Sequence, residues 1–451
     1  MTQTEPNPKR VSRLRWVRRG IGLVVVAGLV LFVVPGIKHS RAIQQLKSNP
    51  KISIESEPNW VLGRLPYSWQ NWIQSNVSRE VWDSLQRPFE INCSQQALSD
   101  ADLAAIGRMT NLKLIDLNDA TFSEKGFSQL AGLHKLRALV LNGSSINDAG
   151  LSHLEGFAEL ETLVLGNTAI SDRGLQHLQN LRRLEFLDLH ETAISDAGMQ
   201  FLSGLTNLES VDLGGANVGN AGLACLNNNR KLKSLNLMNT QVTDVGMVTL
   251  ESFPDLESLD LTHTQVGSTG VRHLQGLKQL EQLYLAQTNV SDSGMQALSG
   301  LLARRGLNLL ETQVTDAGLK HLAGLVYLNI LELSGTDVSD TGLQHLDGLT
   351  QLEFLFLGET RAGNAGLPFI KDLTRLQMLI LSNTPVNDDG LTQLSGMTNL
   401  RLLNLQATQV TDAGLVHLEG LTRLRSLYTE NTRVTPAGLA RLRKKLPKLT
   451  D

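Results

Sequence analysis

A 24-residue repeat constrains the fold of this chain more than any other feature. One copy runs from Leu277 to Gly300, and its glycine, Gly294, recurs at every twenty-fourth position from Gly126 to Gly438. The fourteen glycines are separated by no insertion or deletion. Such a period is typical of a solenoid, in which similar coils stack on one another. The repeat therefore predicts one stack, and not the roughly three globular domains that a chain of this length would otherwise suggest.

The first half of each copy predicts a short strand and a turn. Leu283 and Leu285 are two residues apart, which puts both leucines on one face of a short strand. Thr288 follows, and most copies carry threonine there. We expect its hydroxyl to satisfy backbone groups that a buried turn leaves unpaired.

The second half of each copy predicts a short helix. Ser291 and Asp292 suit a helix start, because their side chains accept first-turn N–H groups and the acid favours the positive helix end. Met295 and Leu298 give this helix an apolar stripe. Gly294 costs about 1 kcal/mol relative to alanine in a helix. The repeated glycine therefore indicates either close packing on the next coil or a backbone angle that needs glycine.

The pattern LxxLxxLxLxxTxVTDxGLxxLxxL resembles the leucine-rich-repeat family over about residues 89–445. It is most similar to ribonuclease-inhibitor-like and F-box-receptor-like members, although no F-box precedes the repeats. The resemblance implies an α/β solenoid, a right-handed horseshoe with a parallel sheet on the concave face and helices on the convex face. The register gives about fifteen strands, from Ile91 to Leu427.

Five segments follow from composition and register. We expect a basic cytoplasmic tail, a transmembrane signal anchor, a juxtamembrane segment with an N-terminal cap, the repeats and a C-terminal capping helix, at residues 1–19, 20–37, 38–88, 89–434 and 435–451. The expected fold class is thus a solenoid preceded by one transmembrane helix.

The anchor expectation depends on an eighteen-residue run without a charge, Gly20–Ile37, behind six Lys and Arg residues. At about 1.5 Å per residue such a helix nearly spans the hydrocarbon layer of about 30 Å. A cleaved signal peptide is the first alternative, but the run ends without an A-x-A pattern. A buried structural helix is the second. An anchor predicts a single-pass membrane protein with the N-terminus in the cytoplasm and the repeats exported.

The segment 38–88 contains four of the five tryptophans, and the repeats contain none. Its apolar residues suit a largely helical cap over the first coil, because a solenoid needs its open end covered. A membrane-surface or partner-binding element is the alternative. Within the repeats one copy departs from the pattern: Arg304 replaces a leucine and Gly306 follows in the strand. We expect a bulge and loosened packing there.

Charge is divided unevenly along the chain. Residues 1–51 hold ten Lys and Arg against one acid, whereas the other 400 residues hold 31 against 43. An acidic repeat region argues against nucleic acid as its partner. The two cysteines, Cys93 and Cys225, lie five repeats apart, too far to form an intramolecular disulfide.

No pattern in the chain indicates an enzyme, a cofactor or a metal centre. No nucleophile has an adjacent base, and there is no phosphate loop or close metal-ligand spacing. Histidines recur in one helix position, but helices on a convex face diverge, which disfavours a shared metal shell. These histidines are His153, His177, His273, His321, His345 and His417.

The concave face carries the functional expectation. Its outward positions are those equivalent to Gln282, Tyr284, Ala286 and Gln287, sixty in all, and they contain no Lys or Arg but eleven acids. Asp188, Asp212, Asp260 and Glu332 belong to this acidic set. Beside it lies an apolar set on four consecutive strands, comprising Ile330, Phe354, Phe356, Met378, Ile380 and Leu402.

Exposed clusters of this kind commonly mark partner sites. We therefore expect a membrane-tethered module that binds a cationic, partly apolar protein or peptide through these ten residues. The alternatives are a structural or adhesive repeat protein without a defined ligand, and Ca²⁺ at Asp188, Asp212 and Asp260, since three carboxylates suit a hard cation.

Overall fold

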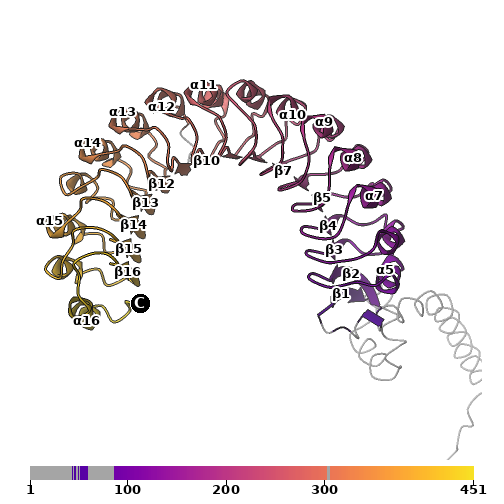
Figure 1. The fold of residues 1–451 in the computed structure, drawn as a ribbon, viewed down its shortest axis with the longest axis horizontal. Helices are drawn as coiled ribbons and strands as arrows, with labels where there is room; N and C mark the ends of the chain where they lie inside the picture. Colours follow the sequence, from indigo (N-terminus) through magenta and orange to yellow (C-terminus); the bar gives the residue numbers. More distant parts are fainter. Residues whose placement is uncertain are drawn as a thin grey trace, which may run out of the picture. The chain divides into compact units, whose positions relative to one another are not determined.

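The computed structural model describes residues 43, 45, 46, 49, 51–58, 86–301 and 305–450. The chain divides into two compact units, Met1–Val164 (unit 1) and Leu165–Asp451 (unit 2). Each unit consists of stacked coils with a strand on one side and a short helix on the other (Figure 1).

Unit 1 contains the first strands and helices. Its strands are β1 Ser53–Pro58, β2 Gln86–Asn92, β3 Leu114–Asp116, β4 Ala138–Val140 and β5 Thr162–Val164. Its helices are α5 Asp100–Gly107, α6 Glu124–Phe127 and α7 Asp148–Leu151, with 3-10 turns η1 Ser128–Leu130 and η2 Ser152–Leu154.

Unit 2 repeats the same coil many times. Its strands are β6 Phe186–Asp188, β7 Ser210–Asp212, β8 Ser234–Asn236, β9 Ser258–Asp260, β10 Gln282–Tyr284, β11 Gly306–Asn308, β12 Ile330–Glu332, β13 Phe354–Phe356, β14 Met378–Ile380, β15 Leu402–Asn404 and β16 Ser426–Tyr428. Its α-helices are α8 Asp172–Leu175, α9 Asp196–Met199, α10 Asn220–Ala224, α11 Ser268–Val271, α12 Asp292–Leu298, α13 Asp316–Leu319, α14 Asp340–Leu343, α15 Asp388–Leu391 and α16 Pro436–Lys445. Its 3-10 helices are η3 Gln176–Leu178, η4 Gln200–Leu202, η5 Gly246–Ser252, η6 Arg272–Gly276, η7 Lys320–Leu322, η8 Gln344–Leu346, η9 Leu367–Phe369, η10 Thr392–Leu394 and η11 Gly414–Leu418.

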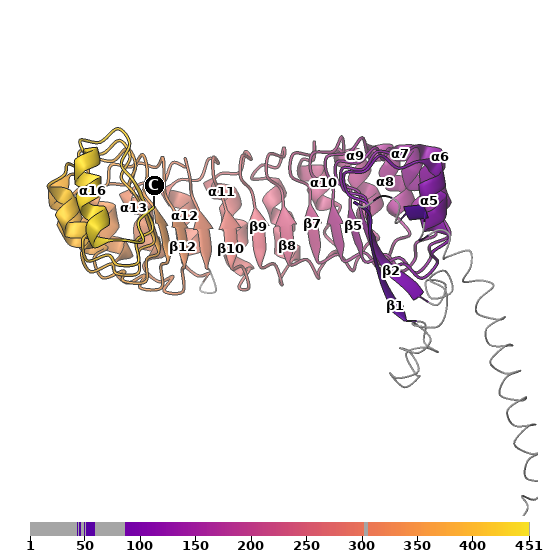
Figure 2. The same ribbon diagram turned by 90° about the horizontal axis from the view of Figure 1, so that it is seen from below.

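Within unit 2 the strands form a parallel sheet with an unshifted register of 24 residues between neighbours. They line the inner side of the curved stack, and the helices line its outer side (Figure 1). Figure 2 shows the strands side by side from below. Leu283 and Leu285 are fully buried, as are their equivalents in other coils. The predicted solenoid with a parallel sheet is confirmed.

The turn after each strand has two recurring structural features. The threonine hydroxyl donates to the carbonyl three residues earlier, as Thr288 does to Leu285 at 2.7 Å, which confirms the predicted role of this column. The residue just before that threonine has a left-handed backbone in every described coil, with φ of 52° at Gln287 and 55° at Ala407. The sequence did not predict this conformation, because glutamine, glutamate, histidine and alanine occupy positions that usually favour glycine.

The recurring glycine is explained by close packing and not by its backbone angle. A Cβ built on Gly318 would lie 2.5 Å from Oδ1 of Asp292 and 3.1 Å from Cγ of Met295, both in the preceding coil. The Asp292 carboxylate lies there because it accepts hydrogen bonds from Thr315, at 2.8 Å from the backbone N–H and 2.7 Å from the hydroxyl. The acid thus joins its own helix start to the next one, which is a role beyond the expected interaction with the helix dipole.

The same hydrogen bonds, from the helix start of one coil to the acid of the preceding coil, recur along unit 2, and we name each set a bracket. The acid and the residue it joins are Asp172–Ser195, Asp316–Ser339, Asp388–Thr411 and Asp412–Thr435. Hydrogen bonds from the backbone and hydroxyl of Thr435 hold the pKa of Asp412 below its usual range. Ser195, Thr315 and Ser339 each accept from a first-turn N–H, which confirms the predicted helix starts in these coils. Ser291 precedes its helix as predicted but makes no such bond.

The transmembrane part of the expected fold class is corrected. Residues 20–37 lie outside the described residues, and nowhere in the described part is a helix long and apolar enough to cross a membrane. The longest described helix, α16, has ten residues. At about 1.5 Å per residue it covers about half of a hydrocarbon layer. The described residues therefore form a solenoid, and the expected membrane helix is not supported.

One detail before the repeats was not expected. The described part of the segment 38–88 includes a strand: β1 pairs antiparallel with β2, with Ile54 opposite Ile91. The tryptophans expected to form a helical cap lie outside the described residues. An added strand satisfies the free edge of β2, which an amphipathic pattern alone does not reveal.

The departing repeat keeps its register. β11 pairs with β10 and β12 with no shift, so the bulge expected at Gly306 was wrong. The backbone N–H groups of Arg305 and Gly306 both donate to Glu281, which keeps the ladder intact. Arg304 itself lies outside the described residues.

Candidate functional site: the inner face of unit 2

The apolar set forms one contiguous surface on β12–β15, which we name the apolar ladder. Its members are Ile330, Phe354, Phe356, Met378, Ile380 and Leu402. Parallel register places Ile330, Phe354, Met378 and Leu402 in one row across the four strands. Phe356 and Ile380 are adjacent in a second row. Ile330 is 43% exposed and the others are half-buried, so the ladder presents carbon surface to solvent while its side chains support one another.

The acids occupy the second row at the other end of the sheet. Asp188 faces Asp212 directly across β6 and β7, whereas Asn236 on β8 separates Asp212 from Asp260 on β9. Glu332 lies further along the same row, next to Phe356. The sheet therefore presents an acidic stretch and an apolar stretch in one line of side chains.

These acids also have a structural role that the sequence did not predict. Oδ1 of Asp212 accepts the N–H of Gly214 at 2.9 Å, and Oδ1 of Asp260 accepts that of Thr262 at 2.8 Å. Asn236 and Asn308 make the same contact, at 2.9 Å in each case. Side-chain oxygens in this row cap the strand ends, which explains why Asp and Asn are frequent there. Each carboxylate keeps its second oxygen for other contacts.

Two of these acids and a neighbouring histidine lie close enough to one another to hold a cation. Ligand atoms of Asp188, His190 and Asp212 lie within 4.8 Å of one another. His190 Nδ1 lies 2.7 Å from Asp188 Oδ1, and the His190 N–H also donates to that oxygen at 3.0 Å. Asp260 is not part of the group, so the calcium site considered from three acids is not assembled. A histidine nitrogen suits a transition metal better than Ca²⁺, and the internal bonds already account for the cluster.

The recurring helix histidines do not assemble a metal site in the described residues, since none of the six belongs to this group. His273 instead pairs with Glu251 at 2.6 Å.

A hollow of about 410 Å³ lies between the two stretches, and we name it the Gly306 hollow. Gly306 leaves its floor open, because a Cβ there would meet only Gln282, at 3.8 Å. Its walls include Tyr284, Ile330 and Phe356. The sequence showed the glycine but not the depression, since the depression depends on how neighbouring strands align.

Glu332 forms an acidic wall of the hollow. Burial raises the pKa of Glu332, against hydrogen bonds from Ser334 that lower it. Its Oε1 accepts the Ser334 N–H at 2.7 Å. A partly desolvated carboxylate beside aromatic side chains is suited to a cation that carries its own carbon surface.

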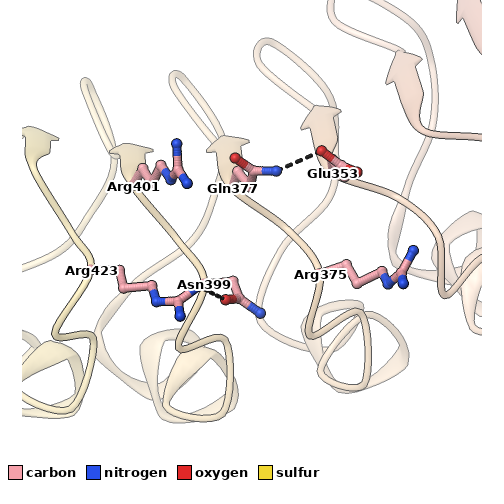
Figure 3. A pocket seen from close by; sticks show the side chains of 6 residues that line it. All are labelled: Glu353, Arg375, Gln377, Asn399, Arg401 and Arg423. Carbon is pink, nitrogen blue, oxygen red and sulfur yellow. Dashed lines mark hydrogen bonds between the residues drawn. The ribbon is translucent and has the colours of Figure 1, made fainter.

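The edge of the sheet, just before each strand, has a different character. Figure 3 shows Glu353, Gln377 and Arg401 ahead of β13, β14 and β15, with Arg375, Asn399 and Arg423 nearer the helices. Gln377 donates to Glu353 at 2.5 Å, and Arg423 donates to Asn399 at 2.6 Å. The cations absent from the inner face are thus present on this edge, at positions that the sixty outward positions do not include.

Comparison with known proteins supports the expected repeat. Models described as leucine rich repeat match residues 230–290 and 204–226. The chain contains leucine-rich repeats. None of the curated proteins compared with this chain matches its sequence.

Solved structures share the fold of this chain. An internalin from Listeria monocytogenes aligns with a TM-score of 0.59 at 26% identity, over 73% of this chain and 88% of the internalin. A leucine-rich-repeat protein of Leptospira interrogans aligns with a TM-score of 0.58 at 20% identity, over 77% of this chain and 91% of its own.

Proposed function

We propose that the inner face of unit 2 binds a cationic, partly apolar protein or peptide. The observation that carries the proposal is the joining of an exposed apolar ladder to an acidic row, with the Gly306 hollow between them. The likeness to an internalin favours a protein-binding module over an enzyme.

The apolar ladder and the acidic row contribute differently to binding in this proposal. Apolar side chains of the partner cover the ladder and fill the hollow, and the burial of Phe356 and Ile330 holds the complex. The free oxygens of Asp188, Asp212 and Asp260 attract and orient its cations, an effect that weakens as salt screens the charges. Glu332 receives a cation at the boundary, where partial desolvation strengthens the contact.

Peptide display against the intact chain tests this proposal. We expect selected peptides to combine Lys or Arg with aromatic or aliphatic residues. Phe356→Ala should weaken a selected peptide about tenfold, mainly through faster dissociation. Phe369→Ala is the matched control, because Phe369 lies on η9 of the outer side and is 39% exposed. Thermal melts of both variants show whether the fold is retained.

Asp212→Asn tests whether the acids affect the association rate of the peptide and not its dissociation rate. Asparagine keeps the cap on the Gly214 N–H but removes the charge, so the association rate and its salt dependence should fall while dissociation changes little. Selection of peptides without cations, or equal binding by Phe356→Ala and wild type, would show that this face is not the site.

Two alternatives give different results in the same assay. A structural or adhesive repeat without a defined ligand yields no saturable peptide binding. A cation-dependent site yields binding that a chelator abolishes and that Phe356→Ala leaves intact.

The compartment of the repeats stays a prediction. Residues 1–37 motivate export of the repeats, and protease added to cells with a permeabilised outer layer checks it. Digestion of the repeats in these cells supports export, and protection of the repeats contradicts it.

A further inference from the structure

A cluster of cations lies at the C-terminal end of the sheet edge, outside the proposed protein-binding face. Arg401 precedes β15, Arg425 precedes β16, and Arg423 lies two residues before Arg425. Lys448 joins them because the chain returns beside β16, where the Thr450 N–H donates to the Arg425 carbonyl at 2.8 Å. The four side chains line a hollow of about 160 Å³ with no acid in its lining. We name it the basic hollow.

Two other cations of unit 2, Lys233 and Arg305, occupy the same repeat position as Arg401 and Arg425. Each is neutralised by an acid one coil earlier: Lys233 pairs with Glu209 at 2.7 Å, and Arg305 pairs with Glu281 at 3.2 Å. The basic hollow departs from this pairing.

The departure has a cause in the sequence. The position one coil before Arg401 is Gln377, which donates to Glu353 and turns toward it (Figure 3). The position one coil before Arg425 is Arg401 itself. Arg423 contacts only the neutral amide of Asn399, at 2.6 Å. In the described part of the chain, no acid pairs with Arg401, Arg425 or Lys448.

Clustered cations of this kind are unfavourable without a counterion. Neighbouring strands lie about 4.8 Å apart, and like charges at that spacing destabilise a sheet. The repeats as a whole carry excess acid, with 31 Lys and Arg against 43 acids beyond residue 51. The basic hollow is therefore a local group of cations on an acidic surface, and not part of a broad basic surface.

We propose that Arg401, Arg423, Arg425 and Lys448 bind a compact oxyanion, namely phosphate or sulfate. Guanidinium groups present paired N–H donors that match two oxygens of such an anion, and a lysine ammonium adds a third direction of contact. The size of the hollow, about 160 Å³, suits a single tetrahedral group. The acidic surroundings disfavour a long polyanion, which would be repelled beyond the hollow.

Titration calorimetry of the intact chain with inorganic phosphate and sulfate, in dilute chloride buffer, tests this proposal. We expect saturable binding of one ion and a higher Tm in its presence. Arg401→Gln and Arg425→Gln should each weaken binding about tenfold, because each removes a charge-assisted pair of hydrogen bonds. Arg425→Lys keeps the positive charge but removes the paired N–H donors of the guanidinium group. It should therefore weaken binding less than Arg425→Gln.

Arg305→Gln is the matched control, since Arg305 holds the same repeat position but is already paired with Glu281. It should leave phosphate and sulfate binding unchanged. All substituted side chains are exposed, and melts without added anion verify that the variants fold.

A competition with dextran sulfate distinguishes a compact anion from an extended one. Displacement of bound phosphate by inorganic sulfate at comparable concentration supports the proposal. Binding of dextran sulfate alone, absence of saturable binding in the wild type, or equal binding by Arg401→Gln, Arg425→Gln and wild type would overturn it.

Discussion

At the scale of the residue, the left-handed turn after each strand is the position where side-chain identity and backbone conformation conflict most. Ala407 has a φ of 55° and lacks the side-chain hydrogen bonds that help asparagine to adopt this angle. Glutamate and glutamine at equivalent positions face the same cost. The repeat tolerates it because the buried leucines and threonine on either side fix the backbone.

Ala407→Gly should therefore stabilise the protein by about 1 kcal/mol, since it removes the left-handed penalty. Denaturant unfolding checks this. Ala323→Gly is the control: Ala323 has a φ of −55°, so glycine gains nothing there and should cost up to about 1 kcal/mol through chain entropy. Equal effects of both substitutions would show that the turn is not strained at Ala407.

The two thiols should differ in reactivity. Cys93 is fully buried, and burial, with the charges of Asp102 and Asp116, raises its pKa to about 12. Cys225 is partly exposed, although burial raises its pKa as well. We expect a thiol reagent to modify Cys225 in the native protein and Cys93 only after denaturation. Mass mapping of the labelled sites checks this, and early labelling of Cys93 would contradict its burial.

Cys93 also makes stability depend on alkaline pH. Its thiol has a higher pKa in the folded chain than the unfolded value near 9.0, so its contribution is complete below pH 9 and is lost as pH rises toward 12. Cys93→Leu restores the residue common to this repeat position and should reduce the loss of stability between pH 9 and 11. Equal slopes for both proteins in urea melts would argue against a buried, neutral thiol.

At the scale of the element, the helix start of most coils in unit 2 is joined to the next by an acid and a glycine acting together. The glycine provides the space in which the preceding acid accepts its hydrogen bonds. Helix propensity alone favours alanine over glycine by about 1 kcal/mol. Close packing favours glycine instead, so the effects of helix propensity and of packing on stability can be compared at one position.

Gly318→Ala should destabilise the protein by about 1–3 kcal/mol, because the new Cβ displaces the Asp292 carboxylate from its bonds with Thr315. Gly324→Ala is the control: no atom lies within 4 Å of its built Cβ and its backbone is not left-handed. Thermal and denaturant melts compare the two. A stabilised Gly318→Ala variant would mean that propensity outweighs packing at this position.

The repeat made the core of each element predictable from sequence. Leu283, Thr288 and Ser195 behave as their patterns indicate, because burial and capping are local consequences of spacing. β1 was not predicted, since edge pairing depends on a segment outside the repeat. The basic hollow was missed for a similar reason: Arg401 and Arg425 lie at a position just ahead of the strand, which a count of outward strand positions leaves out.

The candidate binding face was predictable only in part. Register placed Ile330, Phe354 and Met378 in one row, so their adjacency followed from the period of 24. The depth of the Gly306 hollow and the capping bonds of Asp212 and Asp260 did not follow, because they depend on side-chain rotation and on the turn after each strand.

At the scale of the whole molecule, stability is transmitted from coil to neighbouring coil. The brackets described above join only successive repeats, as Asp388 joins Thr411 and Asp412 joins Thr435. A solenoid of this kind approximates a row of units with nearest-neighbour coupling. Local damage should therefore remain local under native conditions.

Gly414→Ala provides the test, because its Cβ would meet the Asp388 carboxylate at 2.3 Å. Amide hydrogen exchange should accelerate in the coils around residues 388–434 and remain unchanged around residues 172–224. Mass spectrometry of exchanged peptides measures this. Uniform acceleration along unit 2 would indicate that the stack unfolds as one cooperative body.

The row that contains Asp188, Asp212 and Asp260 has a consequence for changing what the inner face binds. Most outward side chains can be exchanged without affecting the scaffold, because the buried columns and the turn carry the backbone's hydrogen bonds. In this one row, however, the side-chain oxygen also holds the strand end. Exchange of aspartate for asparagine there alters recognition and spares the scaffold, whereas exchange for a hydrocarbon side chain alters both. An engineer who wished to retarget this surface would have full freedom at Ile330, Phe354 or Met378, and at Asp212 a choice restricted to residues that still accept a hydrogen bond.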